Sequence, residues 1–517
     1  MASVVGIGAA VFDILMTVDA FPREDTKLRG LETKFQCGGP CATALVAISK
    51  LGESASYMGT VGDDMYGTFV KAEMERYGVD TSCVKVNPGL TFHSVVLLNV
   101  SNSSRTCVWN RGEAAAPTVE DVDLDALKQA KYLHLDGNQL DCAIFAAKKA
   151  HEMGVTVSMD AGGAYPNIEK LLPLVDVLIP SEEFSMKVTG CATAGEAAAV
   201  LQERYHPQIL VITQGSKGGF IWENGREVRY PVFPVKAIDS NGAGDTFHGA
   251  FVAARLKGMD VYEACRFASA TSALKCTRFG AQQGIPGYEE VLEFMKTMDN
   301  LQKLQAANPH IQIHTIHEAA FRRYGSVIQE DTSAFCAAAE TIPFPETGSK
   351  YVASTPELDE IPAAAKLRET HCGGLDEQIG LCWGHSNQLN ALEWHTCNEF
   401  NIAVRELVLL LAKREDLDED DRLNADKVQA FYLAQGEMIE VYSDTLHFCP
   451  CEVTGSGFRC IVGLQRGTNL PIAPEQKVNK LWAANKWLLG HEANTGLIER
   501  GAFPGIYGEN WKINPIR

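Results

Sequence analysis

The sequence predicts an α/β domain followed by a second, mainly β domain. The chain has 517 residues, more than one hydrophobic core ordinarily supports, so at least two domains are expected. Through about residue 295, short runs rich in Val, Ile and Leu alternate with amphipathic stretches, a pattern typical of βα units around a largely parallel sheet. Further on, strand-like runs and frequent turns dominate, which indicates a different architecture.

The strands of the first domain are expected at short apolar runs. Residues 1–6 lack the basic segment, apolar core and cleavage site of a secretory signal, and they are expected to form the first strand. Later runs, separated by helical patterns, predict strands at Val155–Met159, Val175–Ile179 and Ile209–Ile212. Between Thr17 and Gln36 polar and β-prone residues interrupt the alternation, which predicts a small lid sheet over a binding cleft.

The domain boundary is expected near residue 308. A helical pattern from Tyr288 to Ala307 ends before Asn308-Pro309, and proline disfavours helix in the residue before it. We therefore expect one domain over residues 1–300 and another over 312–517. In the second domain, strands are predicted at Glu393–Leu411 and Arg459–Leu464, and helices around Lys477–Leu489.

Composition excludes several classes of function. The formal net charge of −19 argues against a general nucleic-acid binder, which would need clustered Lys and Arg. The sequence contains no apolar run long enough to cross a bilayer. The 15 cysteines are odd in number and none has paired zinc-site spacing, so free thiols in a reducing, cytoplasmic setting are expected.

The strongest functional signal lies at residues 235–251. A strand is expected to end near Ile238, and small residues then form a tight turn before a helix that begins near Gly244. The backbone N–H groups of Gly242, Ala243 and Gly244 would converge at a helix N-terminus and form an anion hole. Asp245 beside it would act as the base that takes a proton from an alcohol. The alternative is that Asp245 only caps the helix.

Residues 239–245, Asp-Ser-Asn-Gly-Ala-Gly-Asp, resemble the C-terminal signature of the ribokinase-like (PfkB) carbohydrate and nucleoside kinases, with Ser240 where Thr is usual. The resemblance extends over roughly residues 3–295. It implies a ribokinase-like α/β sandwich with a small β lid, a sugar substrate, ATP and Mg²⁺. It also implies that Asp245 is the catalytic base.

Three further stretches agree with this resemblance in order and spacing. Residues 6–13 resemble the family's first strand and turn, where Asp13 would hold sugar hydroxyls. Residues 38–44 resemble the N-terminal signature, with sugar-binding positions at Gly38, Gly39 and Thr43. Residues 211–219 resemble the nucleotide-site strand and turn, whose expected contacts are Thr213, Gly215 and Lys217. Lys217 has a plain alternative as a solvated turn lysine.

Two departures from the family pattern concern magnesium and the substrate. Ser181-Glu182-Glu183-Phe184 stands where an Asn-x-x-Glu motif is usual, so Glu182 or Glu183 is expected to reach Mg²⁺ through water. The segments around Thr43 and His248 most resemble the sulfofructose kinases. In that comparison Lys27 and Asn110 would bind an anionic sugar tail, whereas Asn138 stands where an arginine is expected. Lys27 could equally be an exposed lid lysine.

In the second domain, four polar residues have the spacing of a metal site. Glu393 and His395 would project from one face of a strand, Glu399 follows after a turn, and His447 would come from another strand. Nitrogen and oxygen ligands suit Mn, Fe, Zn or Ni. The order resembles the cupin metal motif, with Glu393 in place of the first histidine. His385 is a spare candidate with a structural alternative.

Residues 312–517 also resemble a cupin-type family that includes sulfoquinovose isomerases. The resemblance implies a cupin-like barrel and aldose–ketose isomerisation. The leading hypothesis is a bifunctional enzyme whose C-terminal domain isomerises an aldose and whose N-terminal domain phosphorylates the ketose. The competing hypothesis is a single sugar kinase whose C-terminal domain binds sugar or stabilises an oligomer. A homo-oligomer, a dimer or larger, is expected in either case.

Overall fold

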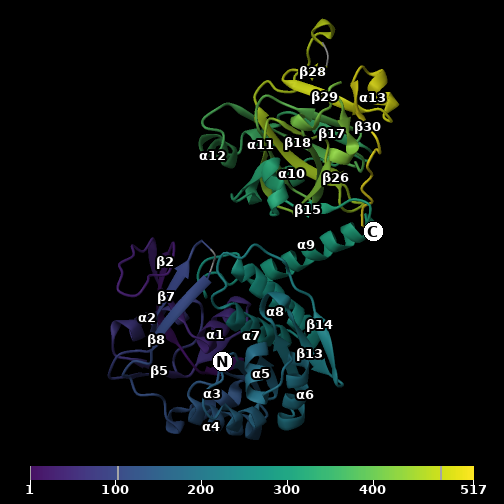
Figure 1. The fold of residues 1–517 in the computed structure, drawn as a ribbon. Coiled ribbons are helices and arrows are strands. Elements are labelled where there is room, and N and C mark those ends of the chain that lie inside the picture. Colours follow the sequence, from purple (N-terminus) through teal and green to yellow (C-terminus); the bar gives the residue numbers. More distant parts are fainter. Residues whose placement is uncertain (1, 102–103, 478–479, 517) are drawn as a thin grey trace. The chain divides into compact units, whose positions relative to one another are not determined.

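A computed structural model describes residues 2–101, 104–477 and 480–516 (Figure 1). The chain divides into two compact units, Met1–Met295 and Lys296–Arg517. The division falls inside helix α9 (Tyr288–Ala307), which ends immediately before Asn308-Pro309, as the sequence predicts.

An eight-stranded sheet forms the centre of the first unit, in the order β14-β13-β12-β11-β10-β9-β1-β4. Neighbours from β4 to β12 pair in parallel, and β13 and β14 continue the sheet antiparallel. The predicted parallel sheet is thus confirmed. Its strands are β1 (Val4–Ile7), β4 (Ala55–Tyr57), β9 (Tyr132–Leu135), β10 (Thr156–Ala161), β11 (Val177–Pro180), β12 (Ile209–Thr213), β13 (Gly219–Glu223) and β14 (Arg226–Tyr230).

Helices pack on both faces of this sheet. Val4 and Val5 are neighbours on β1 and project to opposite faces, where Val4 joins a core with Leu45 of α1 and Val5 joins a core with Ala146 of α4. The helices are α1 (Pro40–Lys50), α2 (Met65–Arg76), α3 (Leu124–Gln129), α4 (Leu140–Met153), α5 (Glu182–Thr189), α6 (Ala194–Tyr205), α7 (Ala243–Leu256) and α8 (Val261–Cys276).

A separate four-stranded sheet, here called the lid, has the order β3-β2-β7-β8, and the predicted segment Thr17–Gln36 contributes its two ends to β2 and β3. Figure 1 shows β2, β7 and β8 side by side at one end of the unit. The strands are β2 (Val11–Val18), β3 (Glu32–Gly38), β7 (His93–Asn99) and β8 (Ser104–Asn110), and a further pair is formed by β5 (Gly59–Gly62) and β6 (Val84–Asn87).

One predicted strand of the first unit is absent. The segment that leads to Ile238 was expected to be a strand, but the structure has no strand between Tyr230 and Ala243. Instead, the N–H groups of Ile238 and Asp239 both donate to the carbonyl oxygen of Cys276, at 2.7 and 3.1 Å. The segment is therefore anchored to the end of α8 by backbone hydrogen bonds and is not paired in a sheet.

The second unit consists mostly of β-sheets, as predicted. A six-stranded sheet contains β16 (Gly325–Ile328), β24 (Met438–Val441), β20 (Glu399–Ala403), β27 (Phe458–Gln465), β18 (Glu377–Gly384) and β17 (Ser349–Val352). A second sheet contains β15 (Ile313–Thr315), β23 (Gln429–Leu433), β21 (Leu407–Lys413), β25 (Thr445–Leu446) and β26 (Cys451–Glu452). A third contains β19 (Ala391–Trp394), β29 (Lys486–His491), β30 (Phe503–Tyr507), β22 (Leu423–Asn424) and β28 (Leu481–Ala483).

The helices predicted around Lys477–Leu489 are wrong. Residues 478 and 479 lie outside the described part of the chain, and the rest of the segment forms β28 and the start of β29. The run Leu481–Leu489 is short, and its apolar side chains pack against β19 and β30, so tertiary context outweighs local helix propensity. The helices of this unit are α10 (Ser333–Glu340), α11 (Pro356–Asp359), α12 (Pro362–Thr370) and α13 (Thr495–Glu499).

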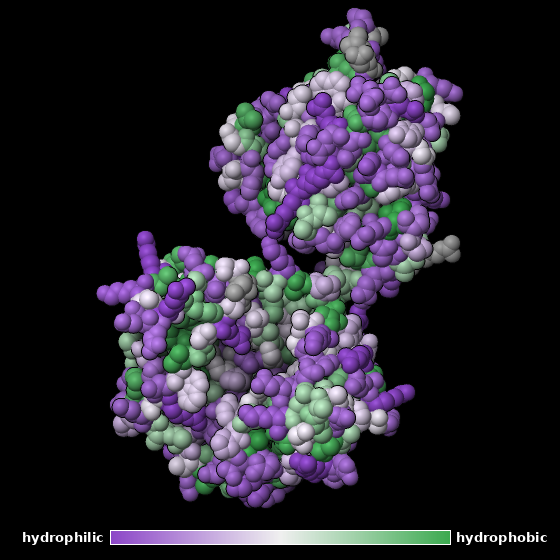
Figure 2. All heavy atoms as spheres, in the orientation of Figure 1, coloured by the Kyte–Doolittle hydropathy of each residue, from purple (hydrophilic) through white to green (hydrophobic). Residues whose placement is uncertain are grey.

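The surface is mainly polar on the face that Figure 2 displays, where hydrophobic residues lie in small groups among hydrophilic ones. Within the described residues, no helix has both the length and the apolar character that a membrane crossing requires.

Candidate functional sites

The first candidate site lies where the central parallel strands end. Asp136 directly follows β9, and Asp160 lies near the end of β10. Because parallel strands present their carboxyl ends at the same edge, the two acids share that edge. Both are buried. The Asp136 carboxylate accepts N–H groups from Ala9 at 2.7 Å, Asn138 at 2.9 Å and Cys41 at 3.2 Å, and so connects its own loop to the loop after β1 and to the start of α1.

The predicted phosphate-binding turn, residues 239–244, is built around Asp239. The buried Asp239 carboxylate accepts the N–H groups of Asn241 at 2.8 Å and Gly280 at 2.9 Å. Gly242 has φ of +74° and closes the turn, a conformation that L side chains rarely adopt. Helix α7 starts at Ala243, and in this described segment no side chain caps it. The Ala243 N–H donates to the carbonyl oxygen of Ser240 at 3.2 Å, so the N–H groups that follow it in the first turn are those that the helix start presents to an anion.

Asp245 lies in the first turn of α7, and the nearby side chains of Asp160 and His248 influence its pKa. His248, one turn further along the same helix, has Nε2 3.1 Å from Asp160 Oδ1, and both residues are buried. Burial raises the pKa of Asp245, the negative charge of Asp160 raises it further, and His248 and Arg105 act against both, with a resulting pKa of about 7. A carboxylate whose pKa lies near the working pH suits a general base.

Phosphorylation is therefore expected to depend on pH through Asp245. A carboxylate with a pKa of about 7 is protonated below that pH and cannot accept a proton. The kcat/KM for the sugar should fall about tenfold per pH unit below pH 7 and level off above it. Initial rates at saturating ATP, measured from pH 5 to pH 9, check this. A profile that is flat between pH 6 and pH 8 would contradict the role of Asp245.

The lid provides a second carboxylate at Asp13 on β2. Ser94 of β7 donates its hydroxyl to Asp13 at 2.6 Å. Burial raises the pKa of Asp13 to about 6, although the hydrogen bonds from Ser94 and Gln36 oppose the shift. A Cβ atom at Gly38 would lie 1.9 Å from Asp13 Oδ2, so only glycine fits beside this carboxylate.

Contacts connect the lid to the phosphate-binding turn. The N–H of Ala281 donates to Gln36 Oε1 of β3 at 3.3 Å. A Cβ at Gly242 would meet Ala281 Cβ at 2.9 Å and the Thr43 methyl at 3.4 Å. Thr43 is fully buried on α1. Gly39 has φ of +94° and a Cβ there would lie 2.5 Å from the Ala9 carbonyl oxygen. The predicted residues Gly38, Gly39 and Thr43 thus lie between Asp13 and the turn.

Asn138 accepts a hydrogen bond from Arg111, a residue that the sequence patterns did not indicate. Arg111, just after β8, donates to Asn138 Oδ1 at 2.9 Å, and Asn138 Nδ2 lies 3.2 Å from the Tyr165 hydroxyl. Asn110 is exposed at the end of β8 and accepts the N–H of Gly112. Lys27 is exposed in the loop between β2 and β3. Arg111 thus brings a guanidinium group to the side chain of Asn138, the position at which the resemblance implies an arginine.

The expected nucleotide-binding residues lie at the end of β12 and in the turn that follows it. Thr213 ends that strand, and Gly215 and Lys217 form a single 3₁₀ turn in which Lys217 is exposed. Gly215 has φ of +59°. Glu182 is engaged with Gln214, whose Nε2 donates to it at 2.9 Å. Glu182 and Glu183 line an open cavity together with Gln214 and Arg229.

Sequence reasoning missed Asp136, Asp160, Arg111 and the contact of His248 with Asp160. A signal for the two acids was present, since each stands at the end of a short apolar run that forms a parallel strand. Arg111 and His248 carried no comparable signal, because their partners are distant in sequence.

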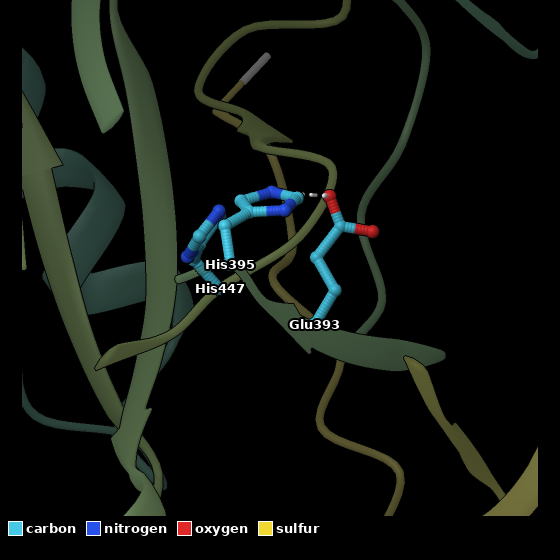
Figure 3. Close-up of side chains that lie close together, drawn as sticks. All are labelled: Glu393, His395 and His447. Atoms are coloured by element: carbon cyan, nitrogen blue, oxygen red, sulfur yellow. Dashed lines mark ion pairs between the residues drawn. The ribbon is translucent and has the colours of Figure 1, made fainter. Parts of the chain in front are cut away.

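The second candidate site is assembled by a backbone bridge. Glu393 on β19 and His447 after β25 exchange backbone hydrogen bonds of 2.7 and 2.9 Å, so their side chains lie next to each other. Ligand atoms of Glu393, His395 and His447 all lie within 4.8 Å of one another (Figure 3). Glu399, the first residue of β20, has Oε2 3.1 Å from His447 Nε2 and 3.6 Å from His395 Nε2. The structure brings all four predicted residues together.

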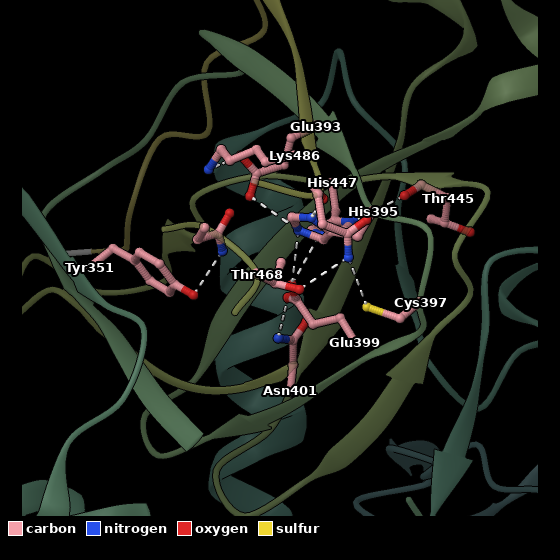
Figure 4. Close-up of polar contacts among 12 residues, drawn as sticks. Tyr351, Glu393, His395, Cys397, Glu399, Asn401, Thr445, His447, Thr468 and Lys486 are labelled. Carbon is pink, nitrogen blue, oxygen red and sulfur yellow. Dashed lines mark hydrogen bonds and ion pairs between the residues drawn. The ribbon is translucent and has the colours of Figure 1, made fainter. Parts of the chain in front are cut away.

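The two imidazole rings are oriented so that Nε2 faces the cluster. His395 Nδ1 lies 2.7 Å from the carbonyl oxygen of Asn485, and His447 Nδ1 lies 2.9 Å from that of Thr445 (Figure 4). Each Nδ1 can donate to its carbonyl oxygen, and each Nε2 then points into the cluster, where that of His447 lies 3.1 Å from Glu399 Oε2. His395 Nε2 is buried and has no hydrogen-bond partner among the described residues. Such orientation by carbonyl groups is usual for metal-binding histidines.

Charge in this cluster is partly balanced without a metal. Lys486 forms an ion pair with Glu393. Burial alone would raise the pKa of Glu393, but Lys486 and the two histidines outweigh it and bring the pKa to about 2. Burial likewise opposes protonation of His447, yet Glu399 raises its pKa to about 9. All four groups of the cluster are buried.

A cavity of about 190 Å³ adjoins the cluster. Glu393, Glu399 and His447 form one part of its wall, and Lys350, Tyr351 and Lys486 are among the other lining residues. His385, the spare candidate, is not among them and has Nδ1 2.9 Å from Glu452. His395 does not line the cavity either, but its ligand atom lies within 4.8 Å of those of Glu393 and His447, so the histidines of the cluster are His395 and His447.

Comparison with known proteins agrees with the first site. Residues 1–287 match the pfkB family carbohydrate kinases. The ribokinase of Haemophilus influenzae is 30% identical over 306 residues, which cover 56% of this chain and 97% of that protein. The ATP-dependent ribose-1-phosphate kinase of Halopiger xanaduensis is 30% identical and covers 57% of this chain and 98% of its own.

Solved structures agree in fold. The ribokinase of Thermotoga maritima has 26% identity and a TM-score of 0.52, and covers 57% of this chain and all of its own. The Arabidopsis thaliana ribokinase complexed with ribose and ATP has 26% identity and a TM-score of 0.51, and covers 57% of this chain and 99% of its own.

The fold and the first site define a sugar kinase of the ribokinase type, to which ATP and Mg²⁺ are suited. The chain belongs to the pfkB family of carbohydrate kinases. Residues 313–511 match a domain of unknown function designated DUF4867. The relatives above do not extend over that part of the chain.

Proposed function

We propose that this protein is a bifunctional sugar enzyme. Its N-terminal unit phosphorylates a ketose with ATP, and its C-terminal unit forms that ketose from an aldose. The first activity is supported by the family and by Asp245 beside the phosphate-binding turn. The observation that carries the second is the unpartnered Nε2 of His395, which faces two carboxylates and a second imidazole.

In the kinase reaction, Asp245 accepts the proton of the attacking sugar hydroxyl. The sugar oxygen bonds to the γ-phosphorus while the bond from that phosphorus to the bridging oxygen breaks, and ADP leaves. The N–H groups of Gly242, Ala243 and Gly244 face the transferring phosphate and stabilise its charge. Asp13 holds sugar hydroxyls from the lid. Thr213, Gly215 and Lys217 contact the nucleotide, and Glu182 or Glu183 reaches Mg²⁺ through water.

The ketose is proposed to carry an anionic group, and 6-deoxy-6-sulfofructose is the candidate. Arg111 supports this proposal because its guanidinium reaches Asn138, the position at which the sugar's tail is expected. Lys27 and Asn110 would complete the anion-binding set. Guanidinium groups bind sulfonates and phosphates well because they are planar and weakly hydrated.

The second site fits a divalent metal of the Mn, Fe, Zn or Ni type, held by Glu393, His395, Glu399 and His447 in a cupin-like domain. When bound, the metal would polarise the carbonyl and the adjacent hydroxyl of an aldose such as sulfoquinovose. The chain's own residues orient the imidazoles through Asn485 and Thr445. Lys486 neutralises one oxygen of Glu393.

A second candidate for the C-terminal unit is a sugar-binding or oligomerisation module without chemistry. The ion pairs of Glu393 with Lys486 and of Glu399 with His447 favour it, because they balance much of the buried charge without a metal. Buried, paired charges of this kind also occur as structural elements.

A substrate screen with aldoses and ketoses, sulfonated and unsulfonated, tests the proposed function. We expect ATP consumption with both the aldose and the ketose form of one anionic sugar, and aldose-to-ketose conversion without ATP, followed by NMR. Arg111→Gln should raise KM for the anionic ketose by about tenfold or more, since it removes a charge-assisted contact. Phosphorylation of neutral sugars only would contradict the anionic substrate, and phosphorylation of the ketose alone would favour the module.

A further inference from the structure

A lysine that the proposed mechanism does not use is buried behind the phosphate-binding turn. Lys275, on α8, has a fully buried side chain. Its Nζ donates to the carbonyl oxygen of Asp239 at 2.8 Å and lies 3.8 Å from Asp239 Oδ2. Isolated buried charges are unfavourable, so a wholly buried lysine requires partners of this kind.

The two groups that Lys275 contacts belong to the residue that organises the turn. The Asp239 carboxylate also holds the N–H groups of Asn241 and Gly280, at 2.8 and 2.9 Å. The ammonium therefore balances a buried carboxylate whose hydrogen bonds set the path of the chain from residue 239 to the start of α7. Other nearby charges are Asp245, which favours the protonated lysine, and Arg105, which disfavours it.

Burial lowers the pKa of Lys275, and Asp239 acts in the opposite direction. The oxygens around the ammonium are a backbone carbonyl and a carboxylate, ligands that would equally suit a free monovalent cation. Because the ammonium group is part of the Lys275 side chain, its presence at this position does not depend on the concentration of cations in solution.

We propose that Lys275 is a positioning residue whose buried ammonium acts as a built-in cation and holds the phosphate-binding turn in its active geometry. This inference rests on the kinase function proposed for the N-terminal unit. Lys275 does not touch the reacting atoms. It acts through Asp239 on the N–H groups that face the phosphate, so its loss should reduce turnover more than sugar binding.

The test compares Lys275→Met with Lys148→Met, a control at an exposed lysine of α4. We expect Lys275→Met to lower kcat about a hundredfold, with KM for the sugar changed less than about threefold, because loss of one donor at such a hole has effects of this size. In Lys275→Ala, ammonium or methylammonium at tens of millimolar, about the range for a weak site, should restore at least a tenth of the lost rate. The control should match the wild type.

Two further measurements distinguish a local effect of Lys275 on the turn from a general loss of stability. They also show whether a negative result is due to an incorrect kinase function. Hydrogen exchange of the peptide spanning residues 239–245 should accelerate in Lys275→Met while that of α4 stays unchanged, a readout that needs no substrate. Wild-type kcat should be the same in potassium and in tetramethylammonium salts. Lys275→Gln, which keeps a donor but no charge, serves if Lys275→Met does not fold.

Several results would overturn the proposal. They are more than half of wild-type kcat in Lys275→Met or Lys275→Gln, faster exchange throughout the unit, absence of rescue, or a wild-type requirement for potassium. Loss of fold in every variant would assign the pair to stability and overturn it as well. A wild type that phosphorylates no sugar, with the expected local change in exchange, would instead refute the proposed function alone.

Discussion

Asp245→Asn is expected to lower kcat for phosphorylation by about 10²- to 10⁴-fold, the typical contribution of a positioned general base. The amide keeps the shape of the side chain and leaves the N–H groups of the turn in place, so KM for the sugar and for ATP should change little. Coupled-assay kinetics with the ketose as substrate measure both effects.

Asp141→Asn, at an exposed acid of α4, is the matched control and should be indistinguishable from the wild type. Retention of more than about a tenth of wild-type turnover by Asp245→Asn would be too much for loss of the base. Such a result would show that Asp245 is not the base; no side chain caps α7 in the described structure, so a capping role would not explain it either.

His447→Ala is expected to abolish aldose–ketose isomerisation and to remove the bound metal, while phosphorylation of added ketose continues. The reason is that His447 Nε2 faces Glu399 within the cluster, whereas the kinase has its own core and site. His395→Ala should have the same effect. Metal content per chain and sugar NMR of one reaction mixture give the two readouts together.

The control for these variants is His385→Ala, since His385 pairs with Glu452 and does not line the cavity. His447→Gln covers the possibility that the alanine variant does not fold. In the reverse experiment, Asp245→Asn should let ketose accumulate from aldose without use of ATP. Conversion of aldose to ketose phosphate by His447→Ala at the wild-type rate would exclude an isomerase that works through this cluster.

Local patterns in the sequence determined much of this protein. The positions of the strands and of the turn at residues 239–244 could be predicted from short local patterns, such as the glycine at 242, whose lack of a Cβ permits φ of +74°. The four residues of the second cluster could also be named, because alternation along a strand places Glu393 and His395 on one face.

Only the tertiary structure decided which distant groups meet. Arg111 reaches Asn138, His248 faces Asp160, and Lys275 lies under Asp239, and each of these contacts joins elements that are distant in the chain. The same dependence explains the failed helix prediction around Lys477–Leu489, where β28 and β29 form because β19 and β30 offer partners. The periodicity of the sequence predicts on which face of a strand or helix a side chain lies. The residue that it contacts depends on how the sheets and helices pack.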